Sequence, residues 1–337
     1  MNSLKIVHCA NFSESKYGAV YYAIDRKLSH GLIRNGHFVY DFSYREVAKN
    51  STFFKSKKFG IKNTNNALLE TLENIKPDLL LLGHSELITI ETLRKAKELY
   101  PQMKIAMWWV DPFEKIIHIP QRLQLIDTFF ATTGEGKLKA IFGEDTYAKL
   151  SFFPNACDDS IEKVYKDNPH KYLYDIIYVG RNDDNRKAFI AYLQSLSFIK
   201  LGMFGHTKEH LLLGSKYFET IQRAKIGLNY SRFNDIELYS SDRIIQLTAS
   251  GIMVMSPIIP GFENLFQEDE IIYFENHEDF KEKLDYYLSH DNERNAIAQK
   301  GYKKAHASFN STRVTKFMLE TILDLPMSET YEWVQTC

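Results

Sequence analysis

Residues 239–256 have the sequence YSSDRIIQLTASGIMVMS. The polar start predicts a loop, and the middle predicts a short helix that ends at Gly251, a residue suited to the left-handed conformation. Ile252 to Met255 then predict a strand covered on both faces, as in a parallel sheet. Arg243 and Gln246 are three apart, so they share one helix face near its N-terminus. Free backbone N–H groups and the helix dipole favour a phosphate there, although an ordinary helix–strand unit with a surface arginine explains the same residues.

Strands and helices alternate along the whole chain. This alternation predicts βαβ units with right-handed crossovers, and therefore doubly wound parallel sheets in an α/β protein. The predicted strands are residues 4–10, 37–42, 79–83, 104–109, 124–131, 175–179, 198–203, 225–229, 252–255 and 270–274. The predicted helices are residues 17–35, 66–75, 91–99, 188–196, 279–289, 291–309 and 311–323.

Length and composition indicate two globular domains. A chain of 337 residues is long for one core, and 44% hydrophobic with 25% charged residues is typical of folded proteins. The net charge of −1 argues against a generally basic nucleic-acid binder. The three cysteines (Cys9, Cys157 and Cys337) have no C-x-x-C spacing, so neither a disulfide framework nor a zinc site is predicted. The odd number and wide spacing of the cysteines predict a reducing, cytoplasmic location. No signal peptide and no apolar run of membrane-spanning length is visible.

The 239–256 segment resembles the nucleotide-binding segment of GT-B-fold glycosyltransferases, especially the CgeB-like (spore maturation protein-like) group. Arg243, Ala249 and Gly251 match that pattern. Gln246 stands where the family has a glutamate that holds the ribose hydroxyls of the donor nucleotide. A glutamine can accept and donate hydrogen bonds, but it lacks the charge that strengthens them. The resemblance implies a GT-B fold, with two Rossmann-like domains facing a cleft and a nucleotide-sugar donor (UDP-, GDP- or dTDP-sugar) as substrate.

A second segment resembles the opening loop of the donor domain in the same family. Gly180 ends a predicted strand and begins a polar loop that runs to Lys187. Arg181 and Lys187 are the candidate phosphate binders, although a solvated basic turn is the simpler interpretation. Asn229 lies at another strand end, where α/β proteins place ligands. The remaining donor contacts implied by the resemblance are Tyr239, Ser241 and Asp242.

The chain is predicted to cross between domains near Pro154 to Asp158, which resembles the crossing seen in many GT-B enzymes. The predicted division is an acceptor-binding domain at 1–155, a donor-binding domain at 156–310, and a helical segment at 311–337 that returns to the first domain.

Two residues are candidates for the group that deprotonates the acceptor hydroxyl. Asp111 follows the strand that ends in Trp108 and Trp109, and this segment resembles one found in the CgeB-like group. We expect burial against Trp109 to raise the pKa of Asp111. An Asp-Pro turn that caps the next helix would explain Asp111 equally well. His84 is the second candidate, and a hydrogen-bonded structural histidine is its alternative. Asn11 is an expected acceptor contact.

No metal is expected. The sequence has adjacent acidic pairs, Asp158-Asp159 and Asp183-Asp184, but no D-x-D motif of the kind that holds an ion in GT-A enzymes. Helix N-termini and basic side chains would neutralise the diphosphate instead. The P-loop, G-x-G-x-x-G and G-x-S-x-G motifs are also missing, which argues against kinases, dehydrogenases and hydrolases.

A cluster of basic and aromatic residues hints at a membrane surface. The cluster spans Lys49 to Lys62 and comprises Lys49, Phe53, Phe54, Lys55, Lys57, Lys58, Phe59 and Lys62. Such residues suit the inner face of an anionic membrane, whereas a solvated loop is the simpler interpretation because helical periodicity is weak.

The sequence therefore predicts a metal-independent glycosyltransferase acting on a glycan, lipid-linked or protein acceptor. Two alternatives stay open: a non-catalytic nucleotide- or sugar-binding protein on a GT-B scaffold, and a GT-B-type nucleotide-sugar epimerase. Gln246 keeps the first alternative open, and few acid–base groups argue against the second.

Overall fold

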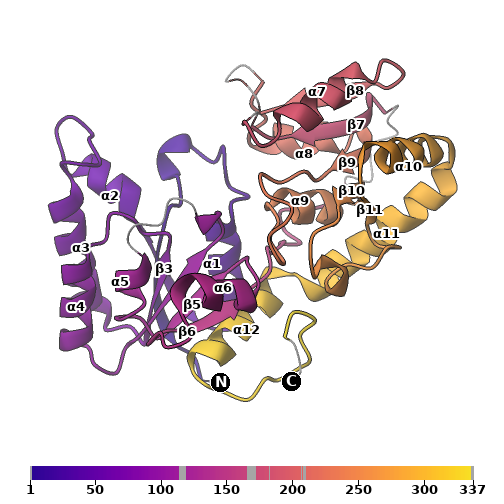
Figure 1. Cartoon of the computed structure of the whole chain (residues 1–337). Helices are drawn as coiled ribbons and strands as arrows, with labels where there is room; N and C mark the ends of the chain where they lie inside the picture. Colours follow the sequence, from indigo (N-terminus) through magenta and orange to yellow (C-terminus); the bar gives the residue numbers. More distant parts are fainter. Residues whose placement is uncertain are drawn as a thin grey trace. The chain divides into compact units, whose positions relative to one another are not determined.

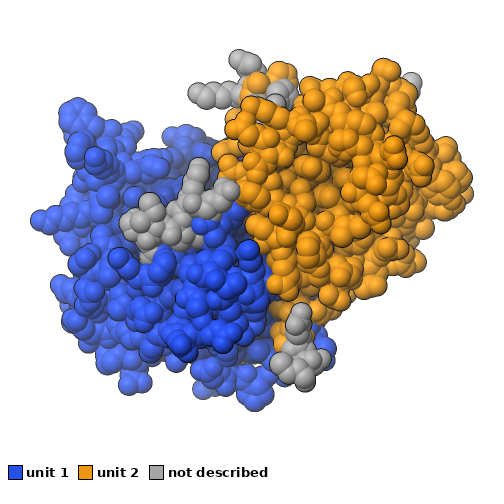
Figure 2. Space-filling view, viewed as in Figure 1, with its two compact units in different colours: residues 1–154, 311–331 blue, residues 155–310, 332–337 orange. Residues whose placement is uncertain are grey.

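A computed structural model describes residues 2–113, 119–164, 172–181, 183–205, 207 and 210–334. The chain divides into two compact units (Figure 2). Unit 1 comprises Met1–Pro154 and Ser311–Tyr331, and unit 2 comprises Asn155–Asn310 and Glu332–Cys337. Each unit is an α/β structure around its own parallel sheet, so the predicted class is confirmed.

Unit 1 contains a six-stranded sheet in the order β2-β1-β3-β4-β5-β6, with every pair parallel. β3 lies inside this sheet, and its sequence LLLLG is buried at every position because helices cover both faces. The strands are β1 (Lys5–Ala10), β2 (Phe38–Ser43), β3 (Leu79–Gly83), β4 (Lys104–Trp109), β5 (Thr128–Ala131) and β6 (Lys149–Phe152).

The helices of unit 1 include the last one in the chain. That helix packs against the first one (Figure 1). A Cβ on Gly31 would lie 2.1 Å from the carbonyl oxygen of Ser311, so only glycine allows this close approach. Asn35 donates to the Thr312 carbonyl at 2.8 Å and reinforces the contact. The helices described are α1 (Ile24–Arg34), α2 (Tyr44–Asn50), α3 (Ile61–Ile75), α4 (Ile90–Leu99), α5 (Ile119–Arg122), α6 (Glu135–Phe142) and α12 (Ser311–Ile322).

Unit 2 contains a five-stranded parallel sheet in the order β11-β10-β9-β7-β8. Its apolar core includes Ile176, Met253 and Phe280 from strands and helices. The strands are β7 (Tyr174–Val179), β8 (Leu201–Phe204), β9 (Ala224–Leu228), β10 (Met253–Pro257) and β11 (Ile272–Phe274). The described helices are α7 (Lys187–Ser195), α8 (Ser215–Ile221), α9 (Arg243–Ala249), α10 (His277–Ser289) and α11 (Asp291–Ser308).

Several predicted boundaries were wrong. The helix predicted at 17–35 begins only at Ile24, because Tyr17 adopts a left-handed conformation (φ 50°) and a series of turns follows it. The strand predicted at 124–131 begins only at Thr128. The sequence analysis also missed five helices and strands, namely α2, α5, α6, β6 and α8. Among the described residues, no helix combines the length and the apolar character needed to span a bilayer.

Candidate functional site

In unit 2, basic side chains gather where the parallel strands end. Arg243 begins α9 and reaches back under the end of β7. Its Nε donates to the carbonyl of Val179 at 2.5 Å, and its Nη1 donates to the carbonyl of Tyr230 at 3.1 Å. The guanidinium lies over the ring of Tyr178, with its central carbon 4.9 Å from the ring centroid. The side chain is therefore held in one orientation at the sheet edge predicted to take the ligand.

The charge of Arg243 is poorly compensated. The residue is only 8% exposed, and burial lowers the pKa of its guanidinium. Within the described ranges, no carboxylate lies within ion-pair distance of it. A desolvated cation held by carbonyl groups and an aromatic ring, without a carboxylate, favours an anionic ligand, because a bound anion would offset the cost of burying the charge.

A second arginine, Arg186, joins this site and was missed from the sequence. Its Nη1 donates to the hydroxyl of Tyr178 at 3.0 Å, and its Nε donates to Asp183 at 3.0 Å. These bonds raise the pKa of the Arg186 guanidinium despite its burial. Asp183 also lies 3.9 Å from the Nε of Arg232. Asp183 and Arg186 are three residues apart at the start of a helix, a spacing that favours an ion pair. This spacing was the sequence signal that could have identified Arg186.

The two predicted phosphate binders of the same loop lie elsewhere. Arg181 is exposed, and Lys187 is 65% exposed and pairs with Asp184 at 2.5 Å. The structure thus brings Arg186 to the Arg243 site, while it directs Lys187 toward solvent.

Gly180 is needed where β7 meets this loop. A Cβ at Gly180 would lie 2.5 Å from the Tyr178 hydroxyl and 2.7 Å from the Nη2 of Arg243. Any larger residue would displace these groups, so glycine permits the arginine to reach the strand end.

Gln246 is engaged by neighbouring side chains. Its Oε1 accepts a hydrogen bond from the Tyr217 hydroxyl at 2.7 Å, and its Nε2 donates to the Oδ2 of Asp242. Asp242 precedes α9 by one residue. A glutamine suits this position because its amide can donate to the carboxylate one turn earlier, whereas a glutamate cannot.

We therefore expect Gln246→Glu to lower the stability of the folded protein. The substitution places a second carboxylate against Asp242, and like charges at this spacing repel. The melting temperature should fall by a few degrees at about pH 8 and recover toward about pH 5, where one carboxyl takes a proton. The double variant Asp242→Asn/Gln246→Glu, which restores one carboxylate and one amide, is the control. An unchanged melting temperature in the single variant would contradict the Asp242–Gln246 contact.

The other residues predicted to bind the nucleotide-sugar donor form hydrogen bonds within their own loops. Asn229 is fully buried, and its amide donates to the Ser256 hydroxyl at 2.9 Å. The Ser241 hydroxyl donates to the Oδ1 of Asn229 at 3.5 Å, and the Ser241 N–H donates to Ser231 at 3.0 Å. Tyr239 is buried in the same loop. These contacts fix the shape of the 239–242 loop that leads into Arg243.

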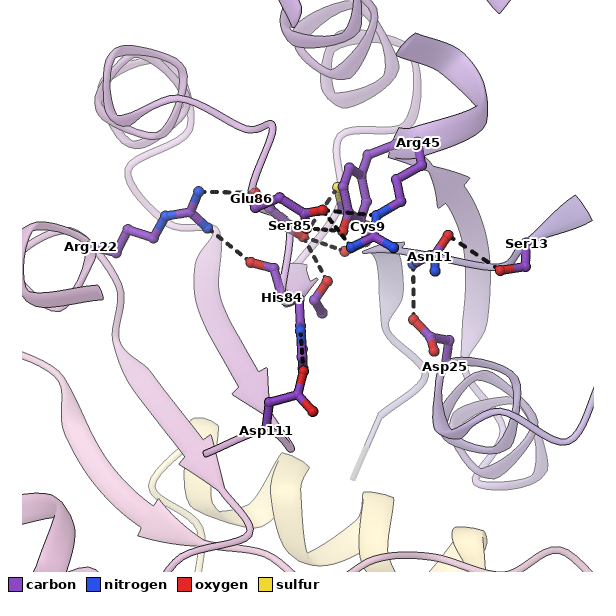
Figure 3. Close-up of polar contacts among 12 residues, drawn as sticks. Cys9, Asn11, Ser13, Asp25, Arg45, His84, Ser85, Glu86, Asp111 and Arg122 are labelled. Carbon is purple, nitrogen blue, oxygen red and sulfur yellow. Dashed lines mark hydrogen bonds and ion pairs between the residues drawn. The ribbon is translucent and has the colours of Figure 1, made fainter. Parts of the chain in front are cut away.

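In unit 1, His84 and Asp111 meet where β3 and β4 end (Figure 3). The Nδ1 of His84 lies 3.7 Å from the Oδ2 of Asp111, and its Nε2 accepts a hydrogen bond from the N–H of Val110 at 3.3 Å. The neutral ring therefore carries its proton on Nδ1, facing the carboxylate. Burial lowers the pKa of His84, and Asp111 partly offsets this effect.

One expectation about Asp111 was wrong. Its side chain is 68% exposed, so it is not buried against Trp109. The imidazole of His84 stacks on Trp109 instead, with ring centroids 4.0 Å apart. Burial therefore acts on the imidazole of His84, whose pKa it lowers.

The loop that carries His84 is clamped by buried groups. His84 and Ser85 both have left-handed backbones, with φ of 55° and 47°. Arg122 donates to the carbonyls of His84 at 3.3 Å and Ser85 at 2.9 Å, and the Ser85 hydroxyl donates to the Cys9 carbonyl at 2.7 Å. These bonds offset the strain of two successive left-handed residues and fix the imidazole.

Asp25 is a further carboxylate of this edge that the sequence analysis missed (Figure 3). It lies in the first turn of α1 and accepts a hydrogen bond from the backbone N–H of Asn11 at 2.9 Å, just beyond the end of β1. Burial raises the pKa of Asp25 to about 6, although the hydrogen bond and nearby arginines oppose the shift. A carboxyl with a pKa raised toward the neutral range is suited to proton transfer.

A metal site was not found in the described part of the chain, where no three acidic, histidine or cysteine side chains lie together in a suitable arrangement. Arg186 and Arg243 supply buried positive charge at the carboxyl edge of unit 2.

Comparison with known proteins places these sites in context. Residues 186–320, which include Arg186, Arg243 and Gln246, match the family model described as glycosyl transferase-like. No curated protein matches the sequence significantly. A glycosyltransferase from Rickettsia africae is 12% identical with a TM-score of 0.64, and the match covers 98% of this chain and 100% of that one.

Two further solved structures have the same architecture. HepE from Anabaena, in complex with UDP, is 10% identical with a TM-score of 0.59 over 95% of this chain and 100% of that one. The β-glucosyltransferase of phage T4 is 14% identical with a TM-score of 0.59, again over 95% and 100%. The predicted GT-B fold is confirmed, and the fold together with the family match supports a glycosyltransferase. Membership of the narrower CgeB-like group stays a prediction.

Proposed function

We propose that this chain moves a sugar from a nucleotide-sugar donor to a hydroxyl group of a glycan, lipid-linked or protein acceptor, without a metal ion. The observation that carries the proposal is the pair of buried arginines at the carboxyl edge of unit 2, Arg186 and Arg243, beside Gly180. Two fixed guanidinium groups match the oxygens of a diphosphate.

The leaving group explains why the arginines matter. As the bond between the anomeric carbon and the diphosphate oxygen breaks, the electron pair stays with the diphosphate. Cations held in place before the reaction stabilise that developing charge without reorganisation. Arg186 and Arg243 would supply this stabilisation in place of a divalent ion. A UDP-sugar is the first donor to test, because HepE was solved with UDP; GDP- and dTDP-sugars follow.

Unit 1 supplies the groups for the acceptor in this proposal. In an inverting transfer, the acceptor oxygen bonds to the anomeric carbon and its proton passes to a base. We assign that base to Asp25, which accepts the Asn11 N–H just beyond the end of β1 and whose pKa burial raises to about 6. Asp111 and His84 would bind the acceptor hydroxyl, with Nδ1–H of His84 orienting the carboxylate. The proposed location is cytoplasmic, with peripheral contact on the inner face of a membrane.

A nucleotide screen followed by a turnover assay tests the function. UDP, GDP, CMP, ADP and dTDP are added to the purified protein with and without magnesium, and the melting temperature is measured. We expect one diphosphate nucleotide to raise it without magnesium, since a ligand of the folded state stabilises that state. The matching nucleotide sugar should then release nucleoside diphosphate in the presence of a glycan or lipid-linked acceptor extract.

The same assay separates the alternatives. A nucleotide shift without release of diphosphate from any sugar donor would favour the non-catalytic binding protein. A new nucleotide sugar formed without acceptor would favour the epimerase. No shift with any nucleotide would contradict the assignment of the arginine site.

A further inference from the structure

The connection between α2 and α3 in unit 1 has an unusual composition. Residues 51–60, here termed the aromatic turn, contain three phenylalanines and three lysines. Lys49 and Lys62 flank the turn, and the whole stretch of residues 49–62 contains no aspartate or glutamate. The connection is drawn as the loop that joins α2 to α3 in Figure 1.

The three phenylalanines face solvent almost completely. Phe53 is 94% exposed, Phe54 is 81% exposed and Phe59 is 72% exposed. The rings of Phe53 and Phe54 touch edge to face, with centroids 5.3 Å apart. Water solvates such rings poorly, so three of them in one turn mark a surface that gains free energy when another apolar phase covers it.

The aromatic turn is anchored at both ends. A Cβ on Gly60 would lie 1.9 Å from the carbonyl oxygen of Ala48, so the backbone packs directly on α2. The Ser56 N–H donates to the Thr52 hydroxyl at 2.9 Å, and the Asn63 amide donates to the Ser51 carbonyl at 3.2 Å. These contacts hold the backbone while the phenylalanine side chains project from it.

The lysines of this stretch have no partners among the described residues. Lys55, Lys57, Lys58 and Lys62 are exposed, and none of them lies within ion-pair distance of a carboxylate in the part of the chain that the structure describes. Their charges therefore add to a local positive potential. Positive charge beside exposed aromatic rings matches the interface of an anionic bilayer, where rings insert among the acyl chains and lysines meet the head groups.

The position of the turn suits this partner. α3 leads directly into β3 of the parallel sheet and therefore runs antiparallel to the strands. Its N-terminus, which follows the aromatic turn, thus belongs to the same sheet edge as the residues after β3, among them His84. A bilayer bound by the turn would lie on the side of unit 1 that carries the proposed acceptor groups.

We infer that the aromatic turn docks unit 1 onto an anionic lipid surface, with Phe53, Phe54 and Phe59 inserted at the bilayer interface and the lysines against lipid phosphates. This surface would give access to a lipid-linked acceptor, but the docking itself does not depend on glycosyl transfer.

Cosedimentation with vesicles tests the inference. The full-length protein should bind vesicles of phosphatidylcholine with phosphatidylglycerol and bind pure phosphatidylcholine vesicles weakly. The triple variant Phe53→Ser/Phe54→Ser/Phe59→Ser should reduce partitioning on the order of tenfold or more. The quadruple variant Lys55→Gln/Lys57→Gln/Lys58→Gln/Lys62→Gln should also lose at least tenfold, because each lysine near the surface contributes attraction. Raising the salt from about 0.1 M to about 0.5 M should weaken wild-type binding.

A variant of four lysines outside the aromatic turn distinguishes the effect of the local lysines from that of the net charge of the protein. Lys76, Lys137, Lys216 and Lys303 are also exposed, so changing these four to glutamine alters net charge equally and should leave vesicle binding intact. Equal binding by the phenylalanine variant and the wild type would overturn the inference, as would equal loss in the control variant. Tighter binding to single-stranded RNA than to anionic vesicles would overturn it too. The nucleotide-induced melting shift should persist in every variant, so failure of docking and failure of the proposed function are distinguishable.

Discussion

Asp25→Asn is expected to abolish most of the turnover and at the same time to make the protein more stable near neutral pH. As the proposed base, Asp25 would contribute on the order of 100-fold to 10,000-fold to the rate. Asparagine keeps an oxygen for the Asn11 N–H bond but cannot take a proton. Donor affinity should not change, because the donor-binding groups are proposed to lie in unit 2.

The stability effect follows from the sign of the pKa shift. The pKa of Asp25 is about 6 in the folded protein, above the usual value of 3.8, so folding favours the protonated form. The stabilisation that the protonated Asp25 carboxyl gives the folded state is complete below about pH 4 and is lost as the pH rises through about 6. Asparagine is uncharged at every pH and avoids this loss. At about pH 7.5 we expect the melting temperature of the variant to exceed that of the wild type by roughly 2–4 °C, and the difference should vanish toward about pH 4.

The pH profile of the wild type gives an independent check. Turnover should rise as the pH passes about 6, when the Asp25 carboxylate forms. Asp111→Asn serves as the comparison: it should lower turnover and weaken acceptor binding, yet keep the same acid limb and leave donor affinity unchanged. Full activity in Asp25→Asn would remove this residue from the mechanism. Loss of the acid limb in Asp111→Asn would assign the base to Asp111, the first candidate from the sequence.

Arg243→Ala is expected to weaken donor binding by about 100-fold or more. The substitution removes a buried cation whose two fixed hydrogen bonds aim it at the sheet edge, and each charge-assisted contact with a phosphate contributes strongly. Binding of the nucleoside diphosphate, measured by calorimetry or by the melting shift, tests this expectation.

Two further variants control for folding and for general charge. Arg243→Lys keeps the charge but not the two-point geometry, so it should recover only part of the affinity. Arg181→Ala removes an exposed cation of the neighbouring loop and should change affinity by a few-fold at most. A folded Arg243→Ala variant with wild-type affinity would place the diphosphate elsewhere.

Much of the fold was predictable because its signals are local. The apolar run at 79–83 predicts a buried parallel strand, and the structure has β3 at those residues. The strand at 104–109 was also right in both bounds. Predicted helix and strand boundaries were wrong where the backbone conformation of a single residue, and not hydrophobic periodicity, sets the boundary, as at Tyr17.

The same boundary explains why Asp25 was missed. A helix from 17 to 35 would place Asp25 in its middle, where a charged side chain is ordinary. The real start at Ile24 places Asp25 in the first turn, against the end of β1, where burial changes its pKa. Arg186 was missed for a different reason. The loop after Gly180 carries three cations, and sequence spacing alone does not tell which of them turns inward to Tyr178.

The return of α12 to unit 1 has a consequence for how the chain is made. Nearly all of unit 2 is one continuous stretch, whereas unit 1 is built from two stretches separated by about half the sequence. A nascent chain leaving the ribosome therefore exposes the α1 surface around Gly31 long before its partner helix is synthesised. Unit 2 can complete most of its core first, and residues 1–154 must wait for residues 311–331 before the core of unit 1 closes.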